Sequence, residues 1–184
     1  PDRLLLWATV LREKQIGTDH AWILKHTGIR ERQFAKEGVA TSDLACEAIE
    51  EAMRVANLTA KDVDGVFLGT VSPDFHQTPP TTTVIDEKLG FSIGGVRNII
   101  FRDISEACCS FMGAFDTAYA HIQNGRCRIS LVVGSDRMTS TMSPFSRNLW
   151  PILADGAGAL VLERTHLDHD AFGPNAFFSF MNGK

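Results

Sequence analysis

The spacing of apolar residues along the chain predicts three helices. Thr41-Ser42-Asp43 offers capping side chains and an acidic first turn, and apolar residues then recur at helical spacing up to about Asn57. A second helix is expected over 81–89, where Gly90 would end it. A third is expected over about 107–124, again followed by a glycine.

Short apolar runs lie between and after these helices and predict strands. The runs with strand character are 63–71, 97–101, 129–133, 157–162 and a last segment at 176–181. The run at 129–133 is almost continuously apolar, as expected for a strand that is buried on both faces. Helices that alternate with buried strands favour a layered α/β domain.

Composition and charge narrow the function classes. A length of 184 residues suffices for one domain with its own core, and 44% hydrophobic with 22% charged residues is typical of soluble globular proteins. The net charge of −4 argues against nucleic acid as the main partner. No apolar run approaches the roughly 20 residues of a membrane span, and Leu4-Leu5-Leu6-Trp7 lacks the basic leader of a signal peptide. We therefore expect a cytoplasmic protein that is not bound to a membrane.

The four cysteines show no spacing typical of metal sites. They are Cys46, Cys108, Cys109 and Cys127, and none forms a CxxC pair. We therefore expect no metal site and a reducing compartment. A cysteine is by default a small buried hydrophobe, so a nucleophile needs a specific argument.

That argument exists at Cys108 and Cys109. A buried strand is expected to end near Phe101, 103–105 would form a turn, and a helix would begin at about Ala107. Unpaired N–H groups and the positive end of the helix dipole would then favour a thiolate, the form that attacks a thioester. The alternative is a core cysteine pair at a tight strand–helix junction. Periodicity does not choose between the two thiols, because adjacent helical residues face about 100° apart.

Six sequence motifs follow one another in order between about Gly17 and Leu162. They are Trp22–Arg32 (WILKHTGIRER), Thr41–Ala45 (TSDLA), Thr70–Asp74 (TVSPD), Asp103–Cys108 (DISEAC), Val132–Asp136 (VVGSD) and Asp155–Ala159 (DGAGA). Together they resemble the N-terminal half of β-ketoacyl-acyl-carrier-protein synthase III and its thiolase-fold relatives. The resemblance implies a thiolase-like layered fold, with a mixed five-stranded sheet and helices on both faces. Residues 1–184 would form the N-terminal domain that carries the nucleophile, and the C-terminal half would be absent from this sequence.

The same resemblance assigns the site. Cys108 falls on the nucleophile, and Cys109 on the small residue after it. Trp22 and Arg147 match a tryptophan and an arginine that sandwich the adenine of coenzyme A, and Thr18 lies at the same entrance. A buried or interface aromatic at Trp22 and a solvated charge at Arg147 are the alternatives.

The implied activity is that of an acyltransferase, with coenzyme A thioester as substrate and no cofactor. An acyl group would pass from acyl-CoA, or from an acyl carrier protein, to the cysteine and then condense with a malonyl thioester. A homodimer, or a heterodimer with a similar chain, is expected. Transfer to an oxygen or nitrogen acceptor is one alternative, and a non-catalytic partner subunit or scaffold is another. The catalytic histidine and asparagine of such enzymes come from the second half, so neither is assigned here.

Four departures from the usual motifs suggest a specialised secondary-metabolism member. His26 stands where arginine is common, Arg102 replaces an apolar residue, Ser110 replaces glycine, and Leu153-Ala154-Asp155 replaces F-G-D. Gly156-Ala157-Gly158 lacks the pattern of a phosphate-binding loop, and we interpret it as close backbone packing before a strand.

Overall fold

The computed structural model describes residues 17–92, 98–143 and 145–164. The strand predicted at 176–181 lies outside these residues. The chain forms two compact units, one made of residues 38–136 together with the segment from Ala157 onward, and the other of the segment up to Glu37 together with 137–156. Each unit is described by itself.

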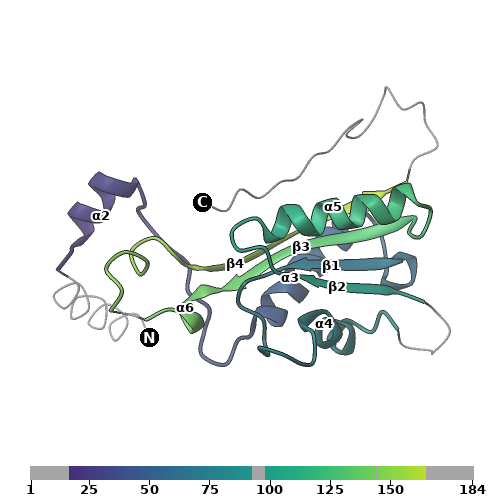
Figure 1. Cartoon of the computed structure of the whole chain (residues 1–184), viewed down its shortest axis with the longest axis horizontal. Coiled ribbons are helices and arrows are strands. Elements are labelled where there is room, and N and C mark those ends of the chain that lie inside the picture. Colours follow the sequence, from purple (N-terminus) through teal and green to yellow (C-terminus); the bar gives the residue numbers. More distant parts are fainter. Residues whose placement is uncertain (1–16, 93–97, 144, 165–184) are drawn as a thin grey trace, which may run out of the picture. The chain divides into compact units, whose positions relative to one another are not determined.

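A four-stranded sheet in the order β2-β1-β3-β4 organises the larger unit (Figure 1). The strands are β1 (Gly65–Gly69), β2 (Ile100–Ile104), β3 (Ile129–Arg137) and β4 (Asp155–Glu163). β1 runs parallel to both β2 and β3. The Arg164 N–H, just after β4, donates to the Arg128 carbonyl just before β3 at 2.8 Å, so β4 runs antiparallel and the sheet is mixed. Five strands were predicted, and the described residues contain four.

Helices cover both faces of this sheet, as predicted (Figure 1). They are α3 (Thr41–Val55) and α4 (Thr81–Leu89) on one face, and α5 (Ser110–Gln123) on the other; Ala60–Asp62 forms a short 3₁₀ helix. Ile49 and Ile85 pack with Leu68 and Leu131 on the first face. Phe67 and Val132 pack with α5 on the second face. The layered α/β class predicted from the sequence is therefore confirmed.

Side-chain caps explain where α3 and α4 begin, and a glycine explains where α4 ends. The Asp43 carboxylate accepts the Ala40 N–H at 2.8 Å and caps α3. Asp103 accepts the backbone N–H groups of Thr81 and Thr82 at 2.6 and 3.0 Å, which caps α4 from the neighbouring strand β2. Gly90 ends α4 in the left-handed conformation with φ 70°, as predicted.

The boundaries around the candidate nucleophile differ from the prediction. The strand expected at 97–101 lies at Ile100–Ile104, so Asp103 and Ile104 belong to β2 and not to a turn. Helix α5 begins at Ser110 and not near Ala107, because Ala107 has a left-handed backbone that no helix accommodates.

The smaller unit contains α2 (His20–Thr27) and α6 (Met138–Thr141). Its centre is the buried Asp155 carboxylate, which accepts the Ala35 N–H at 2.8 Å, the Thr139 N–H at 2.9 Å and the Thr139 hydroxyl at 2.6 Å. Asp155, the first residue of the DGAGA motif, therefore ties together three segments of this unit. Among the helices in the described ranges, none is long and apolar enough to cross a membrane.

Candidate active site

Cys108 lies in the short connection between the end of β2 and the start of α5 (Figure 1). Cys108 is exposed. The neighbouring Cys109 is half-buried and directly precedes Ser110, the first residue of α5. The thiol that the motif series selects is thus also the more accessible of the two. The sequence placed both cysteines inside the helix, and the structure places both before it.

The connection is a tight turn with an unusual backbone. Ala107 has φ 51°, in the left-handed region that costs a non-glycine residue about 1–2 kcal/mol. The Cys109 N–H donates to the Glu106 carbonyl at 3.0 Å, and the Ser110 N–H donates to the Ala107 carbonyl at 3.2 Å. These bonds close the turn over Ala107 and Cys108, and Cys108 is exposed within it.

Two glycines on the sheet let this turn approach closely. Gly69 and Gly134 face each other in the register of β1 and β3. A Cβ at Gly69 would lie 2.5 Å from the Phe111 nitrogen and would also collide with the Ser110 backbone. A Cβ at Gly134 would lie 3.0 Å from the Phe111 ring. The bare strand surface at these two positions therefore sets where α5 begins.

The remaining two cysteines sit in the core. Burial raises the pKa of the Cys46 thiol to about 11. Burial also raises the pKa of the Cys127 thiol. Both are structural residues by this criterion, because the thiolate is the reactive form. The described residues contain no cluster of three or more His, Cys, Asp or Glu side chains suited to a metal ion.

The predicted substrate-binding residues belong to the smaller unit. The Arg147 guanidinium carbon lies 5.4 Å from the centre of the Trp22 ring, so the structure brings this pair together. The His26 ring stacks on Trp22 at 4.3 Å. A flat base held between two groups needs about 7 Å, two van der Waals contacts, so Arg147 must move outward to admit one. Thr18 is 6% exposed, and its hydroxyl has no hydrogen-bond partner within the described residues.

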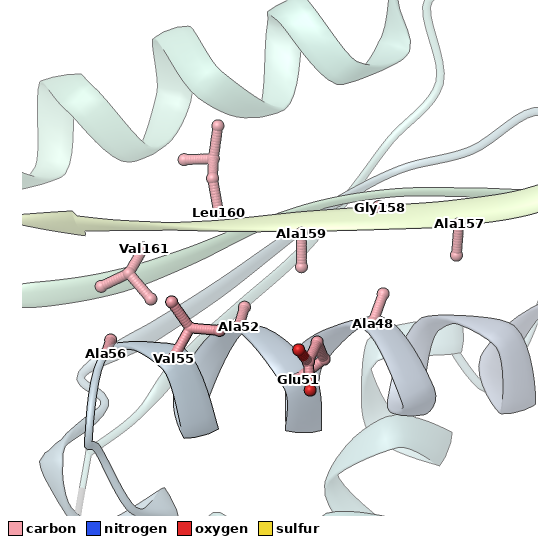
Figure 2. Close-up of a pocket in the computed structure, with 10 residues that line it drawn as sticks. All are labelled: Ala48, Glu51, Ala52, Val55, Ala56, Ala157, Gly158, Ala159, Leu160 and Val161. Carbon is pink, nitrogen blue, oxygen red and sulfur yellow. The ribbon is translucent and has the colours of Figure 1, made fainter.

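An apolar groove of 450 Å³ lies elsewhere, between α3 and β4. Figure 2 shows Ala157, Ala159 and Val161 facing α3, while Leu160 points to the opposite face of the sheet. Its lining contains one charged residue, Glu51, and no nucleophile, so the groove does not belong to the Cys108 site. An added Cβ at Gly156 or Gly158 would meet no atom within 4 Å, so the expected close packing at these glycines is wrong for the part of the chain described here.

Sequence reasoning missed two contributors to the site. It noted that Ser110 replaces the usual glycine but did not predict the hydrogen bonds of the Ser110 hydroxyl to the turn. It also did not predict the left-handed backbone of Ala107, for which an alanine gives no signal. A hydroxyl three residues after Ala107 was the available signal, since serine readily bonds nearby backbone groups.

Comparison with known proteins bears directly on this arrangement. The family model of 3-oxoacyl-[acyl-carrier-protein (ACP)] synthase III matches residues 102–178, which include Cys108. The β-ketoacyl-[acyl-carrier-protein] synthase III of Helicobacter pylori (strain P12) is 39% identical over 150 residues, covering 82% of this chain and 44% of the relative. That of Campylobacter jejuni is 34% identical over 169 residues, covering 92% of this chain and 50% of the relative.

The chain therefore belongs to the β-ketoacyl-acyl-carrier-protein synthase III family. Its fold is similar to the crystal structure of 3-oxoacyl-[acyl-carrier-protein] synthase III from Aquifex aeolicus, with a TM-score of 0.76 and 34% identity over 84% of this chain and 48% of that chain. It is also similar to the priming β-ketosynthase of the R1128 polyketide pathway, with a TM-score of 0.76 and 29% identity over 85% of this chain and 45% of that chain. The synthase III-like chain spans about half the length of the curated relatives it matches.

Proposed function

We propose that this synthase III-like chain supplies the nucleophile of a condensing acyltransferase, and that Cys108 is that nucleophile. The observation that carries the proposal is the exposed Cys108 thiol on a tight turn directly before α5. The other support is its coincidence with the nucleophile of the family motif. The cysteines at 46 and 127 are poor candidates because burial raises the pKa of both thiols.

In the proposed reaction the Cys108 thiolate attacks the carbonyl carbon of an acyl-CoA thioester. The carbon–sulfur bond to coenzyme A then breaks, coenzyme A leaves as its thiolate, and the acyl group remains on Cys108. Loss of carbon dioxide from a malonyl thioester generates a carbanion that attacks this acyl carbon. The new carbon–carbon bond releases Cys108, and a β-ketoacyl thioester is formed.

The substrates and partners follow from the same proposal. Acyl-CoA is the donor and an acyl carrier protein bears the malonyl group, while Trp22 and Arg147 hold the adenine of coenzyme A near Thr18. A planar aromatic and a guanidinium are suited to a base, and the guanidinium also binds phosphate. The histidine and asparagine that assist decarboxylation come from the other half of the enzyme. A dimer and a reducing cytoplasmic setting, which keeps Cys108 as a thiol, complete the proposal.

The test is the intact mass of the protein after incubation with acyl-CoA. We expect a gain of one acyl group in the unaltered chain and in Cys109→Ala, and no gain in Cys108→Ala. The Cys109→Ala variant is the matched control, because it removes the adjacent thiol from the same turn. Acylation that persists in Cys108→Ala and disappears in Cys109→Ala would overturn the assignment.

A further inference from the structure

We infer that Ser110 is a positioning residue for Cys108, whose hydroxyl holds the turn that presents the thiol. The inference rests on the proposed function, since it gives Ser110 a role in the chemistry of Cys108. It goes beyond the family comparison, because the related motif usually has glycine at this position and a glycine carries no hydroxyl.

The hydroxyl of Ser110 both accepts and donates a hydrogen bond within the turn. Its Oγ accepts the Glu106 N–H at 2.9 Å and donates to the Ala107 carbonyl at 2.7 Å. The Ser110 N–H donates to the same carbonyl at 3.2 Å. One residue at the start of α5 therefore makes three hydrogen bonds to the two residues that precede Cys108.

Burial makes these bonds stronger constraints than bonds on an open surface. Ser110 is 3% exposed, so water does not replace either partner readily. A buried hydroxyl without a partner would itself be unfavourable, which fixes the hydroxyl in this orientation. Gly69 lies against the Ser110 backbone and closes the other side.

The hydrogen bonds of Ser110 keep Ala107 in a strained left-handed backbone conformation. Ala107 holds φ 51°, and an alanine released from its surroundings prefers a right-handed or extended backbone. If Ala107 changes conformation, the direction of the Cys108 Cα–Cβ bond changes with it. By holding the carbonyl of Ala107 and the N–H of Glu106, Ser110 fixes the residue before the nucleophile, while the first turn of α5 fixes the residues after it.

The experiment measures how fast iodoacetamide alkylates Cys108 in the full chain, read by peptide mass spectrometry as a function of pH. We expect Ser110→Ala and Ser110→Gly to slow alkylation about tenfold, as loss of about 1.4 kcal/mol of turn stabilisation would do. Thr117→Ala is the matched control. The Thr117 hydroxyl donates to the Gly113 carbonyl at 2.7 Å on the same helix, away from the turn, and its removal should leave the rate unchanged.

A coupled variant separates positioning from general stability. In Ala107→Gly the left-handed backbone carries little strain, so adding Ser110→Ala should cost about twofold instead of tenfold. A thermal melt confirms that each variant is folded at the assay temperature. If Ser110→Ala is unfolded at that temperature, Ser110→Gly, which carries the usual family residue, decides the result.

Three results would overturn the inference: unchanged alkylation in both Ser110 variants, an equal loss in Thr117→Ala, or an undiminished loss in the Ala107→Gly background. Incubation of the unaltered chain with acyl-CoA distinguishes failure of the positioning role from failure of the proposed function. Absence of an acyl adduct together with a tenfold Ser110 effect would refute the acyltransferase role alone. An acyl adduct together with unchanged alkylation of the Ser110 variants would refute the positioning role alone.

Discussion

At the scale of single residues, the surroundings of the four thiols differ sharply. Cys108 is exposed, Cys109 is half-buried at the start of α5, and Cys46 and Cys127 are buried in the core. Periodicity alone could not order the first two, because both thiols lie before the first residue of α5 and outside the helical spacing. The family motif predicts Cys108 as the nucleophile, and in the structure this thiol is the more exposed of the two.

This ordering predicts selective alkylation of the native protein. With a pKa of about 11, Cys46 has about one thiolate in a thousand molecules at pH 8, and burial shields it further. We expect iodoacetamide at pH 8 to modify Cys108 first and to leave Cys46 and Cys127 unmodified until urea is added. Peptide mass spectrometry with and without urea checks this. Equal labelling of Cys46 in both conditions would contradict the core assignment.

At the scale of elements, α5 is positioned by two glycines on the strands beneath it, which carry no side chain. Gly69 and Gly134 are opposite each other on β1 and β3, and the first turn of the helix rests on both. The sequence predicted α4 to its last residue, because Gly90 is a strong local stop signal. It misplaced the start of α5, because nothing in the sequence marks the left-handed backbone of Ala107. It also misplaced β2, whose Asp103 caps a helix that begins 22 residues earlier in the chain. Such long-range pairings leave no local pattern.

A side chain at Gly69, where the start of α5 lies against the sheet, should therefore lower both the stability of the fold and the reactivity of the Cys108 thiol. Gly69→Ala places a Cβ against the backbone of Ser110 and Phe111, and we expect a loss of about 1–3 kcal/mol in the free energy of unfolding together with slower alkylation of Cys108. Urea denaturation and the alkylation assay measure the two effects. Gly158→Ala is the control, since its Cβ meets nothing within 4 Å in the described residues and should change stability by about 0.5 kcal/mol or less. Equal effects of the two substitutions would refute the claim that Gly69 makes room for the start of α5.

The other end of α5 carries a histidine with altered titration. Burial, followed by the charges of Arg126 and Arg102, lowers the pKa of His121. The folded state therefore favours the neutral ring. Its contribution to stability is present above the ordinary pKa of about 6.5 and is lost as the pH falls below that value.

We expect Arg102→Leu to raise the pKa of His121 towards its ordinary value. Arg102 stands where the related motif usually has an apolar residue, and its removal takes away one of the two positive charges that act on the ring. NMR titration of the ring, assigned by its disappearance in His121→Gln, gives the shift. Arg128→Leu removes an exposed arginine that pairs with Glu163 and should leave the titration unchanged. A shift of the same size in that control would show that the cause is not local.

At the scale of the whole molecule, the chain corresponds to about half of the curated relatives. The layered α/β class and the helices on both faces were predictable from the alternation of apolar spacings. The division into two units was not predicted, because it depends on contacts such as those of Asp155, which link residues about 120 positions apart.

Length also bears on activity. We expect residues 1–184 alone to give no sustained condensation of acyl-CoA with a malonyl thioester, because the family resemblance assigns the decarboxylating histidine and asparagine to the other half. Release of labelled carbon dioxide from malonyl thioester, counted per mole of Cys108, measures this. Repeated turnovers by this chain would show that its own residues suffice.

The contact between Trp22 and Arg147 makes the smaller unit a natural optical reporter. Trp22 is 37% exposed, and the Arg147 guanidinium carbon lies 5.4 Å from the centre of its ring. A nucleotide that entered between them would replace a cation above the ring by a stacked base, which alters the intensity and wavelength of the indole emission. Under the proposed function, entry of coenzyme A would be followed in real time through the protein's own fluorescence, without a label on either molecule.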